Sequence, residues 1–101
     1  MFAQTPQPPY TAVIFTSILS RDTEGYMEAA KEMEHLAKIQ DGYLGIESAR
    51  DDLGITVSYW RDEDCAQRWK HVMEHEAVQQ IGRQRWYQAY KVRIATVNRA
   101  Y

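Results

Sequence analysis

The stretch Leu53–Trp60, with the sequence Leu-Gly-Ile-Thr-Val-Ser-Tyr-Trp, decides the fold that the chain is expected to adopt. Its β-branched and aromatic residues favour a strand, and it ends on two rings, Tyr59 and Trp60. The acidic residues after Arg61 open a helix at its favourable end, and this helix carries a third ring at Trp69. The pattern therefore predicts a patch of rings where a sheet meets its covering helix. Pockets for planar organic molecules are often built this way.

Hydrophobic periodicity extends this prediction in both directions along the chain. The predicted elements are a strand at 11–19, a helix from Asp22 or Thr23 to Gln40, strands at 43–50 and 55–60, a helix from Asp62 through Trp69, a short helical segment at 77–81 and a last strand at 90–94. Residues 51–54, Asp-Asp-Leu-Gly, have the composition of a hairpin turn between the middle strands. The order βαββαβ indicates an α+β, ferredoxin-like domain with a four-stranded antiparallel sheet.

The first strand, at 11–19, also predicts the quaternary state. Its apolar residues lie on both alternating faces, which is typical of a strand covered on both sides. Two helices cover only one face of a four-stranded sheet. The other face therefore needs a partner, most simply a second copy of the chain, and we expect a homodimer.

Length and composition limit the remaining possibilities. The 101 residues suffice for one domain, expected at 11–101, preceded by an extended proline-containing arm at 1–10. A net charge of −2 gives no electrostatic footprint for nucleic acid or an anionic membrane surface. The longest apolar run is too short to span a bilayer, and no secretion signal is recognisable. Together with a single cysteine, these features predict a cytoplasmic protein.

Five residues are candidates for a ligand site on the helix side of the sheet. Phe15, Trp69 and Trp86 are expected to form its walls, although each ring can equally be core packing. His75 and Arg83 are expected at its mouth, where a neutral imidazole can act as a base on a phenol and a guanidinium can hold an oxyanion. A structural histidine and an arginine paired with a nearby glutamate are the alternatives.

Other reactive residues give weaker indications. His71 and His75 are four positions apart, as in a metal pair on a helix, but the spacing offers no third ligand, and we expect no metal site. Glu47 lies within a strand, where burial would shift its pKa and an edge position would not. Cys65, at the start of the second helix, is by default a packing residue.

The chain resembles a known family at several of these points, namely 9–15, 42–50, 54–60, Trp69, His75 and 82–87. It resembles the antibiotic biosynthesis monooxygenase (ABM) domain of the small stand-alone bacterial type. The resemblance implies a dimeric α+β barrel in which two ferredoxin-like protomers pack sheet to sheet. The haem-degrading members of that family need an Asn on the first strand and a His ten residues after the Trp of the second helix. Here Gln79 stands ten residues after Trp69 and the first strand holds no Asn, so haem degradation is not expected.

The resemblance implies a cofactor-independent monooxygenase that acts on a small aromatic or quinol-type substrate. In that chemistry the ionised substrate itself reduces O₂, while the protein orients it and excludes water. The alternative is a non-catalytic, dimeric ligand-binding or stress-related module on the same fold, because one fold hosts many functions.

Overall fold

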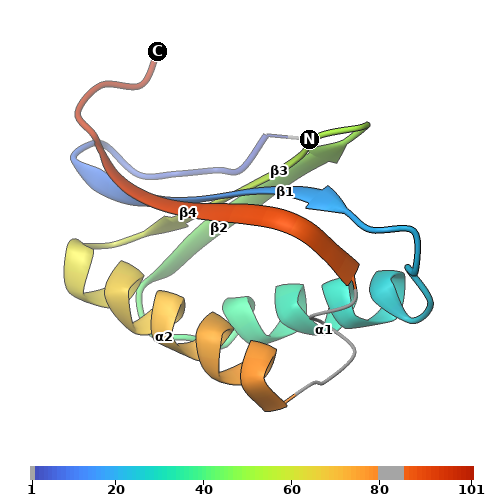
Figure 1. The fold of residues 1–101 in the computed structure, drawn as a ribbon. Coiled ribbons are helices and arrows are strands. Elements are labelled where there is room, and N and C mark those ends of the chain that lie inside the picture. Colours follow the sequence, from blue (N-terminus) through green and yellow to red (C-terminus); the bar gives the residue numbers. More distant parts are fainter. Residues whose placement is uncertain (1, 80–85) are drawn as a thin grey trace.

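The computed structural model describes residues 2–79 and 86–101. Within these ranges the element order is βαββαβ, so the predicted ferredoxin-like order is confirmed. The elements are β1 (Tyr10–Leu19), α1 (Tyr26–Lys38), β2 (Tyr43–Arg50), β3 (Gly54–Trp60), α2 (Glu63–Gln79) and β4 (Tyr87–Val97) (Figure 1). Neither described helix combines the length and apolarity that a membrane-spanning segment requires.

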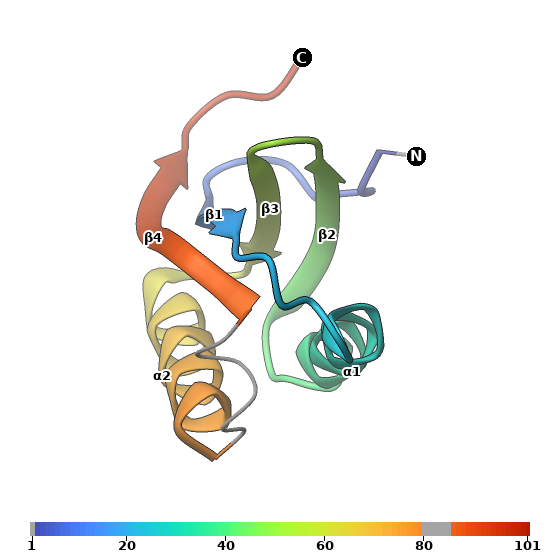
Figure 2. The ribbon, with the colours of Figure 1, turned by 45° about the vertical axis from the view of Figure 1, so that its right-hand side comes forward.

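The strands form one antiparallel sheet in the order β2-β3-β1-β4. Both helices lie on the same side of this sheet (Figure 1). Figure 2 shows that they lie under its two edges, α1 near β2 and α2 near β4. The central strands β1 and β3 therefore cover the space between the helices.

Side chains of the central strands alternate between the helix-covered face and the opposite face, which we call the open face. Val13, paired with Ser58, points towards the helices and is only 1% exposed. Ile18 and Ile55 lie on the open face and are 40% and 42% exposed. The prediction that the first strand is apolar on both faces therefore matches the structure.

The N-terminal arm lies along part of the open face. The backbone N–H of Ala3 donates to Glu47 Oε2 at 2.9 Å, and Thr5 Oγ1 donates to the hydroxyl of Tyr10 at 3.0 Å. Gly45 makes room for the arm, because a Cβ at that position would lie 2.7 Å from the Cβ of Ala3. Part of the face that the sequence assigned to a partner is thus covered by the chain itself.

The core lies where the helices approach the sheet most closely. Trp60 and Trp69 stack with ring centroids 5.5 Å apart and an interplanar angle of 26°. Ala37 and Cys65 pack beside them, and both are almost completely buried. Gly42 has a φ of 81°, and a Cβ there would collide with the thiol of Cys65. Burial raises the pKa of that thiol, so Cys65 serves as a packing residue.

Two element starts differ from the prediction. Asp22 and Thr23 do not cap α1. The helix begins after Gly25, whose φ of 81° turns the chain into it. β4 begins earlier than predicted, at Tyr87, because its pairing with β1 continues past a register shift to Leu19. Both differences arise from backbone conformation or pairing that periodicity does not detect.

The second helix is also longer than predicted. α2 runs unbroken to Gln79, so the separate segment expected at 77–81 is, as far as it is described, a continuation of the same helix. The physical reason is that no Gly or Pro occurs after Asp62 until Gly82. His75, which stands between the two predicted helical segments, consequently lies within α2.

Candidate functional site

A cavity of about 810 Å³ lies between the covered face of the sheet and the two helices. Its volume falls in the range of small-molecule pockets, roughly 300–1,000 Å³. Six aromatic residues from both helices, β1 and the beginning of β4 contribute to its wall. They are Phe15, Tyr26, Trp69, Trp86, Tyr87 and Tyr90.

Four of these rings form a connected cluster at the end of the cavity where β4 begins. Phe15 lies with its ring centroid 5.4 Å from that of Tyr87 and 5.6 Å from that of Tyr90. Tyr26 meets Tyr87 edge to face at 5.8 Å. These are favourable aromatic geometries, so the cluster holds its own shape and presents ring faces and edges to a ligand.

Trp86 extends the cluster and is held in a fixed orientation. Its ring meets Tyr26 edge to face at 5.9 Å. Its indole Nε1–H donates to the carbonyl oxygen of Glu24 at 2.7 Å, which ties the start of β4 to the loop before α1. Trp86 is 6% exposed and therefore contributes an apolar wall rather than a donor.

The opposite end of the cavity is built on the core tryptophans. Trp69 lines the cavity, and its ring stacks on Trp60, which lies behind it and outside the lining. The Nε1–H of Trp60 donates to Ser58 Oγ at 2.9 Å, so the buried side chains of Trp60 and Ser58 are hydrogen-bonded to each other.

The acidic groups of the described wall are paired at the surface. Glu34 forms an ion pair with Lys38 at 3.4 Å, and Glu74 forms one with Lys70 at 3.2 Å. Both pairs are substantially exposed. The wall also carries two cationic side chains, Lys31 on α1 and Arg50 at the end of β2, and the guanidinium of Arg50 donates to Ser17 on β1.

Of the five predicted site residues, the structure brings three to the cavity wall. Phe15, Trp69 and Trp86 line it, and whether they bind a substrate stays a prediction. Arg83 lies outside the described residues. His75 is exposed on the unbroken helix α2 and is not among the described residues that line the cavity. Its role as a base at the pocket mouth stays a prediction.

His71 and His75, four positions apart on α2, are both exposed. His71 Nδ1 lies 3.8 Å from Glu74 Oε1, and both side chains are exposed. Among the residues that the structure describes, no three His, Cys, Asp or Glu side chains gather as metal ligands would.

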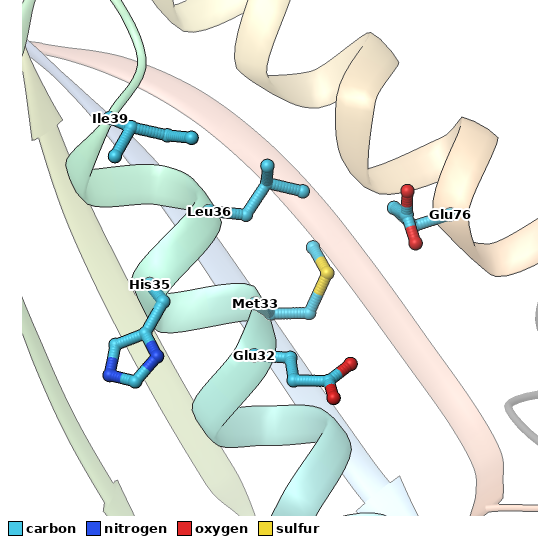
Figure 3. A pocket seen from close by; sticks show the side chains of 6 residues that line it. All are labelled: Glu32, Met33, His35, Leu36, Ile39 and Glu76. Atoms are coloured by element: carbon cyan, nitrogen blue, oxygen red, sulfur yellow. The ribbon is translucent and has the colours of Figure 1, made fainter.

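A second hollow, of about 400 Å³, lies in the groove between α1 and α2. Figure 3 shows Met33 and Leu36 pointing towards α2, which carries Glu76, while His35 points away from it. Ile39, at one end of the hollow, is 78% exposed. The described wall of this groove contains no Phe, Tyr or Trp, and its volume is about half that of the cavity under the sheet, so we place the candidate site in the larger cavity.

Glu47 belongs to the open face, away from the cavity. Tyr59 donates its hydroxyl hydrogen to Glu47 Oε1 at 2.6 Å, and this bond, with the one from Ala3, holds the pKa of the carboxyl below its usual value. Burial, followed by the bond to Glu47, raises the pKa of Tyr59 to about 12. This pair anchors the N-terminal arm.

The comparison with known proteins agrees with this fold. SnoaB, a cofactor-independent oxygenase from Streptomyces nogalater, superposes with a TM-score of 0.72 at 9% identity, over 92% of this chain and 97% of SnoaB. A protein named "putative antibiotic biosynthesis monooxygenase" from Nitrosomonas europaea superposes with a TM-score of 0.67 at 11% identity, over 97% of this chain and 96% of that protein. The chain therefore has the ABM-like fold.

The sequence itself has a much nearer relative. The chain is 50% identical to the uncharacterized protein YqjZ of Bacillus subtilis over 99 residues, which cover 96% of this chain and 87% of YqjZ. It belongs to the same family as YqjZ. No family model matches the chain.

Proposed function

We propose that the chain is a cofactor-independent monooxygenase that acts on a small aromatic or quinol-type substrate bound in the cavity under the sheet. The observation that carries this proposal is the ring-lined cavity itself, about 810 Å³ in volume. The ABM-like fold, shared with an oxygenase of this kind, supports the same assignment by analogy.

The cavity wall suits the work that this chemistry demands of a protein. Flat faces such as Phe15 and Trp69 hold a planar substrate in one orientation, and their apolar surface keeps water from the reacting carbon. The substrate would supply the electrons and O₂ would accept them. One oxygen atom would enter the organic product, and the other would leave as water.

Oxygen uptake by the purified, metal-free protein in the presence of quinols and polyphenols tests the proposal. A variant that blocks the cavity makes the test specific. Ala30 lines the cavity from an exposed position on α1, so Ala30→Trp should fill part of the space without disturbing the core. Glu28→Trp, on the same helix but outside the lining, adds the same ring elsewhere. We expect uptake to be lost in the first variant and kept in the second. Equal activity in both would place the reaction outside this cavity.

A non-catalytic ligand-binding module is the second candidate, and one observation favours it. The described wall contains no His or Cys, and its carboxylates Glu34 and Glu74 are ion-paired. A binding protein needs no base. It would bind the same aromatic compounds, with the same sensitivity to Ala30→Trp, but would consume no oxygen above the rate of the compounds alone.

A further inference from the structure

Arg50, Gly54 and Ser17 lie opposite one another across β2, β3 and β1. The guanidinium of Arg50 spans this row. Its Nη1 donates to the carbonyl oxygen of Ser17 at 3.2 Å, and its Nη2 donates to Ser17 Oγ. A Cβ at position 54 would overlap the guanidinium, so only a glycine leaves Arg50 this path across the sheet. Three strands thus cooperate to hold one cation at the edge of the cavity.

The charge of Arg50 has no anionic partner within the described residues. Asp51 and Asp52 follow it in the chain, yet neither forms an ion pair with it. Ser17 is a neutral acceptor and uses two of the five N–H donors of a guanidinium, which leaves about three for a ligand. An exposed guanidinium that is oriented in this way and has no counter-charge is well suited to bind an anion.

The surroundings of this cation are aromatic. Its Cζ lies 5.7 Å from the ring centroid of Tyr26. Phe15 lies two residues before Ser17 in β1, so both side chains are on the same face of the strand. The ring of Phe15 contacts those of Tyr87 and Tyr90. A flat ring that packs on this cluster therefore has its edge beside the guanidinium.

We propose that Arg50 is the substrate-positioning residue of this cavity and that the ligand is a planar aromatic anion, with its charged oxygen on Arg50 and its ring on the Phe15 cluster. This inference deepens the proposed function and rests on the same cavity. Phenolate, enolate and carboxylate share the required chemistry. For an oxygenase the relevant form is the phenolate or enolate, because the ionised substrate gives electrons to O₂ more readily than the neutral one.

Binding of two matched probes tests the inference without any turnover. 2-Naphthoate carries a charged oxygen pair, and 2-naphthamide has nearly the same shape without the charge. We expect the intact protein to bind the naphthoate roughly tenfold or more tightly than the amide, since charge-assisted hydrogen bonds are the stronger kind. Arg50→Gln should abolish this preference and leave the affinity for the amide within about twofold. Arg50→Lys keeps the charge but loses the forked donor geometry of the guanidinium, so it should retain part of the preference for naphthoate.

Arg93→Gln is the matched control, because Arg93 pairs with Ile14 and carries the same charge on the open face. It should leave the preference intact, and thermal unfolding checks that each variant is folded. The inference is wrong if the intact protein shows no preference, if Arg50→Gln weakens both probes equally, or if Arg93→Gln acts as Arg50→Gln does. Failure of the proposed function looks different, because the preference for naphthoate would remain while no substrate in the screen drives oxygen uptake.

Discussion

Replacing Trp69 by Phe tests whether its ring binds a ligand at the cavity wall or only packs in the core. Trp69 is 4% exposed and stacks on Trp60, so it contributes to stability whatever its function. Its truncation to alanine would cost roughly 3–5 kcal/mol, a large part of the roughly 5–15 kcal/mol that stabilises a typical domain. Trp69→Phe keeps one ring of the indole and loses the buried area of the second ring. This loss lowers the free energy of unfolding by roughly 1 kcal/mol and Tm by about 4–8 °C.

The effect on binding follows from the face of Trp69 that lines the cavity. An aromatic pair contributes roughly 0.5–1.5 kcal/mol beyond its buried area, so losing part of this contact should weaken 2-naphthol binding about two- to tenfold. Titration calorimetry measures the affinity, and circular dichroism measures Tm on the same samples.

Trp60→Phe supplies the matched control. Trp60 shares the stack but does not line the cavity, and its loss also removes the hydrogen bond to Ser58. This variant should lose at least as much stability as Trp69→Phe while keeping the affinity for 2-naphthol. If both variants lower Tm and neither changes the affinity, Trp69 is only a core residue and the ligand does not occupy this cavity.

Three further expectations follow from the described contacts. Light scattering at micromolar concentration should give the mass of a homodimer, because Ile18 and Ile55 stay exposed beside the arm, and a clean monomer mass would contradict this. Because the pKa of Glu47 is lowered, its contribution to stability is present above about pH 4.3 and is lost as the pH falls through its folded value. The contribution of Tyr59 is lost as the pH rises from about 10 to about 12. Urea unfolding across pH should show both changes in stability, and Glu47→Gln should remove the one at acidic pH. His75→Ala should leave oxygen uptake unchanged, because the side chain is exposed outside the cavity lining, and a strong loss of rate would restore it as the base.

The fold could be predicted because its signals are local and repeated. Alternation of apolar residues along 11–19 and the turn composition of 51–54 fix strands and hairpin, and they appear in the structure nearly at the predicted positions. Helix ends were less predictable. Gly25 starts α1 through a backbone conformation, and α2 passes His75 because nothing in the sequence breaks it.

The site was only partly predictable, since its key contacts join distant strands. The rings were detectable because large aromatic residues near a sheet–helix junction are conspicuous in the sequence. Arg50 was missed because, along the chain, it is an arginine at the end of a strand before an acidic turn. Its role depends on the register that aligns it with Gly54 and Ser17. Gly54 did not reveal this role, because a glycine is expected as the last residue of the predicted turn at 51–54.

The residues that pack between the helices and the sheet differ between the two ends of α1. At the C-terminal end of α1 and the start of α2, Ala37 and Ala66 are completely buried and bring the helices close to the sheet. At the other end of α1, the rings of Tyr26 and Trp86 meet edge to face. The aromatic cluster of the cavity wall lies at this end, near Tyr26. Arg50 lies at that same end. The proposed anion site at Arg50 therefore adjoins the ring wall of the cavity.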